Sequence, residues 1–283
     1  MKTVDNIKDT RQIINQWKNQ GYTIGLVPTM GFLHDGHASL IKRACKENDK
    51  VVVSIFVNPI QFGPNEDFEN YPRDFKKDCD LCRELGVDLI FNPKAEEMYP
   101  SEINTRVDIE KLGDNLCGAK RKGHFSGVCT VVTKLFNILT PDKAYFGQKD
   151  AQQLAIIKKM VADLNFNVEI IPCEIVREDD GLAMSSRNSY LTEPQRKAAL
   201  ILSESLNVAK ESLIKGERNA ETIKKLIEQK IQSEPLAVID YVEIVDSETL
   251  VSVKEISNDI LVAIAVKIGK TRLIDNFGVK MEG

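Results

Sequence analysis

The chain has 283 residues, of which 42% are hydrophobic and 28% are charged, and its net charge is −4. This length predicts one large domain or two unequal ones, and the composition excludes fibrous and disordered classes. The acidic balance argues against nucleic-acid binding, which needs a basic surface. No apolar run approaches the roughly 20 residues that cross a bilayer, so we expect no membrane partner. The N-terminal residues lack a signal-peptide pattern, which favours a cytoplasmic protein.

Short β-branched runs alternate with helical patterns in the first part of the chain. Strands are expected at residues 24–28, 51–57, 87–91, 144–147 and 168–176. Helices are expected at residues 37–48, 74–86, 125–139 and 150–165. Because strands and helices alternate, we predict an α/β fold, a Rossmann-like parallel sheet with helices on both faces, for residues 1–176.

The pattern changes after Met184. One long helix is expected from about Pro194 to Ile214, and a second from Ala220 to Ile231. Three strands then follow at residues 239–246, 259–269 and 271–277. Helices followed by a run of strands are typical of a separate α+β unit, so residues 177–283 are predicted to form a smaller α+β C-terminal domain.

Six cysteines are scattered along the chain, at positions 45, 79, 82, 117, 129 and 173. In a chain without secretory features this distribution favours reduced thiols over a disulfide framework. Cys79 and Cys82 form a CxxC pair, yet they lie in a helical pattern without a second ligand pair nearby. Two half-buried helix cysteines are therefore favoured over a zinc or redox site.

Two of the three histidines, His34 and His37, lie in VPTMGFLHDGH, between a predicted strand and a predicted helix. In parallel α/β sheets, ligands bind outside the carboxyl ends of the strands, where helix N-termini attract anions. The pair could ligate a metal with help from a distant residue, serve the structure alone, or contact phosphate or a transition state. Gly31 and Gly36 favour the last interpretation, because glycine allows a ligand to approach the backbone closely.

Two further strand ends carry polar side chains. Asn58 and Gln61 follow the strand expected at 51–57, where an ordinary turn with a solvated Gln61 is the simpler interpretation. In GQKDAQQ, Lys149 could neutralise phosphate, and Asp150 could cap a helix or contact a sugar hydroxyl. Gln153 would follow one helical turn later on a related face.

The segment GLAMSSRN, residues 181–188, follows the strand-rich part of the chain. Its two hydroxyls and its arginine are donors of the kind that bind a triphosphate. A serine-rich surface turn would show the same pattern, so this segment alone leaves both interpretations open.

Five ordered stretches closely resemble the motifs of the pantothenate synthetase family: VPTMGFLHDGH, SIFVNPIQFG, KGHFSGVCTVV, YFGQKDAQQL and GLAMSSRNSYL. HDGH is also similar to the HxGH motif of the nucleotidyltransferase superfamily, and MSSR to its mobile second phosphate-binding signature. The resemblance implies an AMP-forming ligase of pantothenate biosynthesis, on the coenzyme A pathway. Such a ligase condenses (R)-pantoate with β-alanine through a pantoyl-adenylate intermediate, with ATP as co-substrate. It further implies Mg²⁺, a homodimer, and a C-terminal lid domain at residues 177–283.

The resemblance also implies roles for individual residues. The catalytic residues would be His37, the proton donor, with His34 and Lys149. ATP would be bound by Met30, Gly31, Phe32, Leu33, His34, Asp35, Gly36, His37, Gly147, Gln148, Lys149, Asp150, Val176, Met184, Ser185, Ser186 and Arg187. Pantoate would be bound by Gln61, Gln153, Pro28 and Met30, and β-alanine by Gln61. Asn58 and Phe62 would help to shape the pantoate pocket, and Arg121 and His124 would border the second substrate. The metal ligands are left open, with Asp78 and Asp150 as candidates.

Other classes of protein fit the sequence less well. A dinucleotide-dependent oxidoreductase would need a G-x-G-x-x-G turn after its first strand, where this chain has PTMGFLHDGH. A fragment of an aminoacyl-tRNA synthetase would share HDGH, but the chain lacks a basic RNA-binding face. A nucleotide-binding regulatory module would not need the full set of polar residues expected here.

Overall fold

The structure is a computed structural model that describes residues 1–64 and 66–281. The chain divides into two compact units. The first comprises Met1–Gly113, Arg121–Gln148 and Gln153–Glu174, and the second comprises Asp114–Lys120, Lys149–Gln152 and the residues from Ile175 onward. Two short segments that precede Ile175 in the chain therefore belong to the second unit, which the order of elements in the sequence does not reveal.

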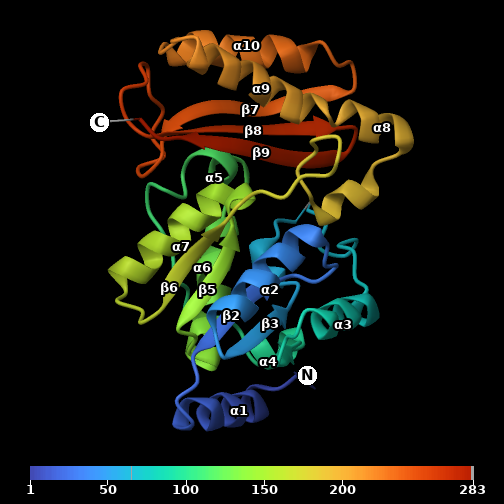
Figure 1. Ribbon diagram of the computed structural model, residues 1–283, viewed down its shortest axis with the longest axis vertical. Coiled ribbons are helices and arrows are strands. Elements are labelled where there is room, and N and C mark those ends of the chain that lie inside the picture. The colour runs from blue at the N-terminus through green and yellow to red at the C-terminus, as the bar shows by residue number, and fades with distance from the viewer. Residues whose placement is uncertain (65, 282–283) are drawn as a thin grey trace. The chain divides into compact units, whose positions relative to one another are not determined.

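The first unit contains a six-stranded sheet in the order β1-β4-β3-β2-β5-β6, in which all neighbouring strands are parallel (Figure 1). The strands are β1 Lys2–Val4, β2 Ile24–Thr29, β3 Lys50–Ile55, β4 Leu89–Phe91, β5 Lys143–Gly147 and β6 Glu169–Cys173. The predicted Rossmann-like parallel sheet is confirmed, although β1 is too short for its pattern to be predicted. The strand order reverses between β2 and β5, and in such sheets the ligand crevice opens at this point.

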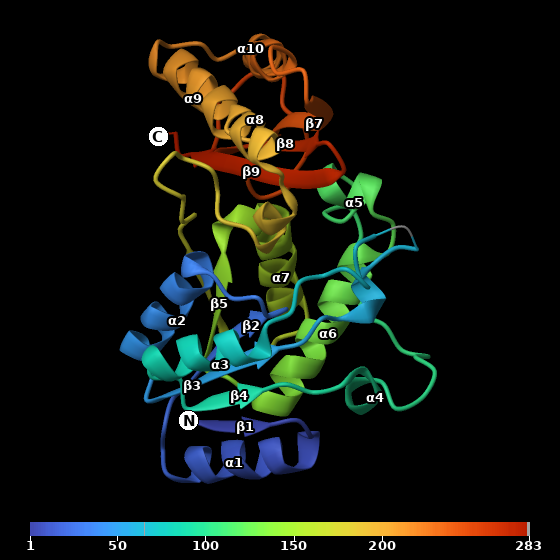
Figure 2. The same ribbon diagram turned by 90° about the vertical axis from the view of Figure 1, so that its right-hand side faces the viewer.

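Helices cover both faces of this sheet. The helical elements of this part of the chain are α1 Ile7–Asn19, α2 Asp35–Glu47, η1 Pro59–Gln61, α3 Phe75–Glu84, α4 Ala95–Met98, α6 His124–Leu139, η2 Gln148–Asp150 and α7 Ala151–Asp163. Of these, the end of η2 and the first two residues of α7, Lys149–Gln152, belong to the second unit. Figure 2 shows α2 and α3 on one face and α6 on the other. Ile41 and Ala44 of α2 are fully buried against strand residues such as Val53, because apolar residues three and four apart share one face of a helix. This packing sets where α2 begins relative to β2.

The second unit contains an antiparallel sheet in the order β7-β8-β9. Its elements are α5 Leu116–Lys120, η3 Ser186–Tyr190, α8 Glu193–Ala198, α9 Ile201–Ile214, α10 Ala220–Gln232, β7 Ala237–Asp246, β8 Ile260–Ile268 and β9 Thr271–Val279. Helices α9 and α10 lie along the sheet (Figure 1), and Leu206 and Ile227 share a core with Val262. The predicted α+β fold is confirmed.

The single long helix predicted from Pro194 to Ile214 is wrong, because the chain forms α8 and α9 there. Between them, the N–H groups of Leu200 and Leu202 bond to carbonyls three residues earlier instead of four, which tightens the turn and ends α8. A tightened turn changes the apolar spacing so little that the sequence pattern does not detect it. None of the described helices is both long and apolar enough to cross a membrane.

Candidate active site

The loop that joins β2 to α2 has an unusual backbone. Gly31 and Phe32 both adopt the left-handed region, with φ of 81° and 52°. A Cβ atom added to Gly31 would lie 3.0 Å from Oδ2 of Asp78 and 3.0 Å from Cγ2 of Ile55. Glycine therefore suits this position both because a side chain would be crowded and because φ is positive. Phe32 has no such freedom and needs neighbouring contacts to hold it in place.

Asp78 of α3 supplies those contacts. Its carboxylate accepts hydrogen bonds from the backbone N–H of Phe32 at 2.9 Å and of Leu33 at 2.7 Å. The side chain is 1% exposed, and burial raises the pKa of Asp78, whereas the two backbone donors favour its ionised form. Asp78 therefore holds the loop. Its place beside Cys82 on the buried face of α3 was the sequence signal for this role, since a carboxylate there needs partners.

His34 and His37 form a reciprocal cap at the N-terminus of α2. Nδ1 of His34 accepts from the N–H of Gly36 at 3.1 Å, and Nδ1 of His37 accepts from the N–H of His34 at 3.3 Å. A backbone N–H can only donate, so each neutral ring carries its proton on Nε2. The ring centroids are 4.1 Å apart. The cap thus offers two neighbouring Nε2–H donors at a helix end that attracts anions.

This geometry favours the anion-contact interpretation of the pair over the metal interpretation. Both Nδ1 atoms are engaged by backbone donors. Across residues 1–64 and 66–281, no group of three or more His, Cys, Asp or Glu side chains could hold a metal ion. All six cysteines, including Cys79 and Cys82, have free thiols.

Asn58 and Gln61 are buried at the end of β3, with exposed fractions of 1% and 8%. The solvated turn considered for Gln61 is therefore wrong. Nδ2 of Asn58 donates to Oε1 of Gln61 at 3.0 Å and to the carbonyl of Gly127 at 3.1 Å. Nε2 of Gln61 donates to the sulfur of Met30 at 3.3 Å. Met30 and Gln61, both predicted to bind pantoate, are thus brought together.

A second chain of contacts supports the backbone of Gln61. Nδ1 of His124 lies 2.9 Å from the Gln61 carbonyl and must donate to it, so Nε2 accepts from Arg121 at 2.9 Å. Arg121 makes a bidentate pair with Glu66 at 2.7 and 2.6 Å. Burial opposes the charge of Glu66, but Arg121 holds the pKa of that carboxyl below its ordinary value. In this structure Arg121 and His124, which were predicted to border a substrate, support η1.

The predicted residues near the end of β5 fall in both units. Gly147 ends β5, and Gln153 is half-buried in α7. Lys149 belongs to the second unit, where Nδ2 of Asn276 donates to its carbonyl at 2.8 Å. Lys149 and Ser185 line one small hollow of that unit. Two residues predicted to bind ATP are therefore close together in the second unit.

The segment from Val176 to Arg187 forms a small hairpin and cap. The N–H of Met184 donates to the carbonyl of Val176 at 3.0 Å, and Oγ of Ser185 accepts from the N–H of Arg187 at 3.3 Å. Five residues predicted to bind ATP thus lie on one local structure: Val176, Met184, Ser185, Ser186 and Arg187. Its anchor is a bidentate pair between Arg177 and buried Asp275, which was not predicted from the sequence. The polar pair Asp275–Asn276 inside an apolar strand was the available signal.

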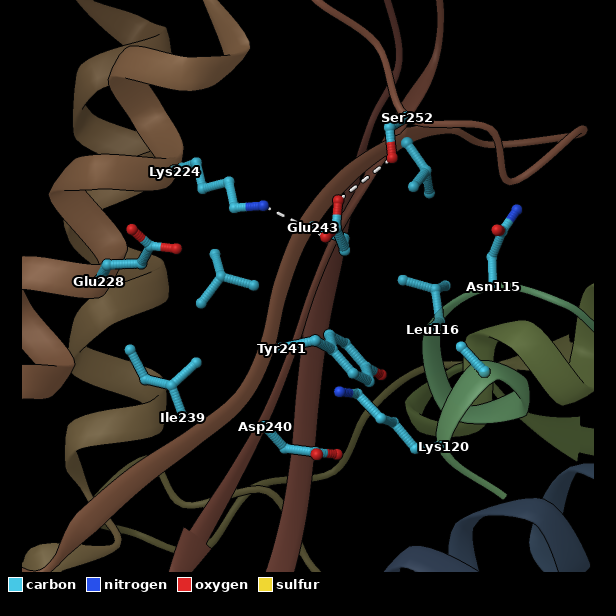
Figure 3. Close-up of a pocket in the computed structure, with 13 residues that line it drawn as sticks. Asn115, Leu116, Lys120, Lys224, Glu228, Ile239, Asp240, Tyr241, Glu243 and Ser252 are labelled. Atoms are coloured by element: carbon cyan, nitrogen blue, oxygen red, sulfur yellow. Dashed lines mark hydrogen bonds and ion pairs between the residues drawn. The ribbon is translucent and has the colours of Figure 1, made fainter. Parts of the chain in front are cut away.

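A separate cavity of about 400 Å³ lies within the second unit, beside β7 (Figure 3). Lys224 pairs with Glu243 at 3.2 Å on its wall, and Tyr241 and Lys120 extend into it. Its lining has mixed charge and includes none of the residues predicted to bind ATP, pantoate or β-alanine. The residues predicted to bind the substrates therefore lie outside this cavity.

A parallel sheet with a histidine-capped helix at its carboxyl edge is typical of α/β proteins that bind anionic ligands. A sequence model of the family described as "Pantoate-beta-alanine ligase" matches residues 2–278. The pantothenate synthetase of Clostridium botulinum is 63% identical over 281 residues, covering 99% of this chain and 100% of that protein. The chain belongs to the pantoate-beta-alanine ligase family.

Solved structures agree with this assignment. The pantothenate synthetase of Thermus thermophilus is 43% identical with a TM-score of 0.93, and the match covers 98% of this chain and 99% of that one. The pantoate-beta-alanine ligase of Francisella tularensis, complexed with "Beta-gamma ATP and Beta-alanine", is 39% identical with a TM-score of 0.80. That match covers 98% of this chain and 97% of that one.

Proposed function

We propose that this chain condenses pantoate with β-alanine in two steps, with ATP as the activating co-substrate. In the first step, a carboxylate oxygen of pantoate attacks the α-phosphorus of ATP, and pyrophosphate leaves. In the second, the amine of β-alanine attacks the acyl carbon of pantoyl adenylate and an amide forms. AMP leaves and carries the oxygen that had joined the acyl carbon to the phosphorus. Activation is needed because a free carboxylate would have to expel oxide, whereas AMP is a good leaving group. Family membership and the Francisella complex support this reaction.

The cap of α2 is the observation that carries the proposal. Its two Nε2–H groups and the end of the helix supply donors for the charge that develops on the transferring phosphoryl group. The Nε2–H of His37 would also donate a hydrogen bond to an oxygen of that group as charge develops on it. Lys149, Ser185 and Arg187 would add a cation, a hydroxyl and a fork-shaped cation for the remaining phosphate oxygens.

Pantoate recognition is assigned to the buried network at the end of β3. Gln61 would donate from Nε2 to an oxygen of pantoate and would also contact β-alanine. Gln153 would provide a second amide, while Pro28 and Met30, both half-buried, would form the apolar wall. Such a site rejects molecules without matching oxygens, because the buried donors would then lose their partners.

Mg²⁺ would accompany ATP and partly neutralise the charge of its phosphates, held largely by phosphate oxygens and water. Of the two carboxylates considered, Asp78 is occupied by backbone donors, whereas Asp150 is exposed and fits this role better. The homodimer, the cytoplasmic location and a lid formed by residues 177–283 also belong to this proposal.

A product assay tests the proposed reaction. Purified protein incubated with ATP, Mg²⁺, pantoate and β-alanine is expected to yield AMP, pyrophosphate and pantothenate in equal amounts, measured by ion-exchange chromatography. Omitting pantoate should abolish AMP formation, because pantoate supplies the attacking oxygen. Formation of ADP, or of AMP at the same rate without pantoate, would reject the proposal.

A further inference from the structure

Tyr99 follows α4 and contacts the network that holds Gln61. Its hydroxyl donates to Oδ1 of Asn58 at 2.8 Å. The ring lies 6.2 Å from that of Phe56, centroid to centroid, and the ammonium of Lys134 lies 5.5 Å from its centre. Burial raises the pKa of Tyr99, which keeps the hydroxyl protonated. Tyr99 is therefore a hydrogen-bond donor to Asn58, the residue that contacts Gln61.

The amide of Asn58 can take only one orientation in these surroundings. The carbonyl of Gly127 can only accept, so the atom 3.1 Å from it must be Nδ2. Oδ1 then faces the hydroxyl of Tyr99. If the amide were turned over, its oxygen would face the carbonyl oxygen of Gly127, which is unfavourable for a side chain that is 1% exposed. Gly127 therefore fixes the orientation of the amide, and Tyr99 supplies the donor for Oδ1 in that orientation.

The orientation of Asn58 determines that of Gln61. The second N–H of Asn58 points at Gln61 and requires an acceptor, so the nearer atom is Oε1, at 3.0 Å. Nε2 of Gln61 therefore lies on the other side, toward the sulfur of Met30, which is a weak acceptor. An oxygen of a ligand is a stronger acceptor than a thioether and would compete for this N–H.

We propose that Tyr99 is a positioning residue that acts through Asn58 to hold the Gln61 amide with Nε2 toward the substrate. Gln61 then selects a substrate that presents an acceptor oxygen, a carboxylate or a hydroxyl lone pair, and disfavours one that presents only a donor. The inference rests on the proposed function, in which Gln61 binds pantoate.

Tyr99→Phe removes the hydroxyl and keeps the ring. We expect the KM for pantoate to rise about tenfold, because Oδ1 of Asn58 loses its donor and the amide of Gln61 becomes free to turn. The KM for ATP should stay within about twofold of its value in the unmodified protein, and kcat within about threefold. A purely structural defect would instead change all three values together with the thermal midpoint.

Tyr145→Phe is the matched control. Tyr145 is fully buried in the same unit, and its hydroxyl contacts Asn48 and Glu47, outside the network of Gln61. Its loss should leave the KM for pantoate within about twofold. If Tyr145→Phe raised this KM as much as Tyr99→Phe does, the effect would not be specific to the network and the inference would be overturned.

Gln61→Glu tests the orientation of the amide directly. The substitution keeps an oxygen for Asn58 but replaces the N–H donor by an acceptor. We expect it to weaken pantoate binding more than Gln61→Ala does. A milder effect than that of Gln61→Ala would mean that Gln61 acts as an acceptor, contrary to the inference.

The outcomes separate this inference from the function on which it rests. If the unmodified protein forms no pantothenate, or if Gln61→Ala leaves the KM for pantoate unchanged, the proposed function or the role of Gln61 fails. If both of those results are as expected and Tyr99→Phe leaves the KM for pantoate unchanged, the inference about Tyr99 alone fails.

Discussion

Replacing His37 by alanine is expected to slow the formation of pantoyl adenylate by about a hundredfold or more, the usual effect of removing one preorganised donor from a developing charge. The same change removes the acceptor for the N–H of His34, so α2 should also lose roughly 1 kcal/mol of stability. The adenylate step can be followed without β-alanine, by exchange of labelled pyrophosphate into ATP. Unfolding by urea measures the stability.

His37→Gln separates the two contributions. Glutamine is a natural partner in a capping box, so it can accept from the N–H of His34, but it lacks the ring Nε2–H that His37 directs at the phosphoryl group. We expect His37→Gln to be as stable as the unmodified protein. Its rate of adenylate formation should fall nearly as much as that of His37→Ala. Near-normal exchange in both variants would show that His37 has no catalytic role.

Gly127→Ala is expected to reduce activity about as much as His37→Ala does, although Gly127 is not proposed to contact a substrate. A Cβ atom at Gly127 would lie 2.5 Å from the carbonyl oxygen of Ile60 and 2.7 Å from Cα of Gln61, so the backbone of η1 must shift. A displacement of this kind can cost about a hundredfold in kcat/KM. We expect kcat/KM for pantoate to fall by about this factor. Overpacking should also lower the free energy of unfolding by about 1–3 kcal/mol.

Gly63→Ala provides a control in the same segment. A Cβ there would meet only the side chain of Glu66, at 3.7 Å or more, which is ordinary contact. This variant should keep kcat/KM for pantoate within about threefold. If Gly127→Ala behaved like Gly63→Ala, the close approach of α6 to η1 would not control the position of Gln61.

Local features of the sequence predicted the central part of the candidate site. The run IGLVP predicted β2, and the helix predicted from His37 is confirmed as α2, which begins two residues earlier at Asp35. These features are local, because a strand, a left-handed glycine and a cap each depend on residues that lie within a few positions. The capping role of both histidines also arises within four residues.

Long-range partners account for what the sequence did not predict. Asn58 and Gln61 are buried because Asn58 bonds to Gly127, 69 residues further along the chain. The carbonyl of Lys149 bonds to Asn276, which is 127 residues away, and Lys149 therefore belongs to the second unit. No periodic pattern links residues at such separations, so a single sequence shows the polar residues but not which of them support one another.

The most direct test of the account follows one oxygen atom from pantoate to AMP. Pantoate labelled with ¹⁸O in its carboxylate is incubated with the protein, ATP, Mg²⁺ and β-alanine, and the AMP is analysed by mass spectrometry. Attack of the carboxylate on the α-phosphorus predicts one ¹⁸O in each AMP formed, because the joining oxygen leaves with the phosphate. AMP without label, or label in inorganic phosphate alongside ADP, would contradict an adenylate intermediate.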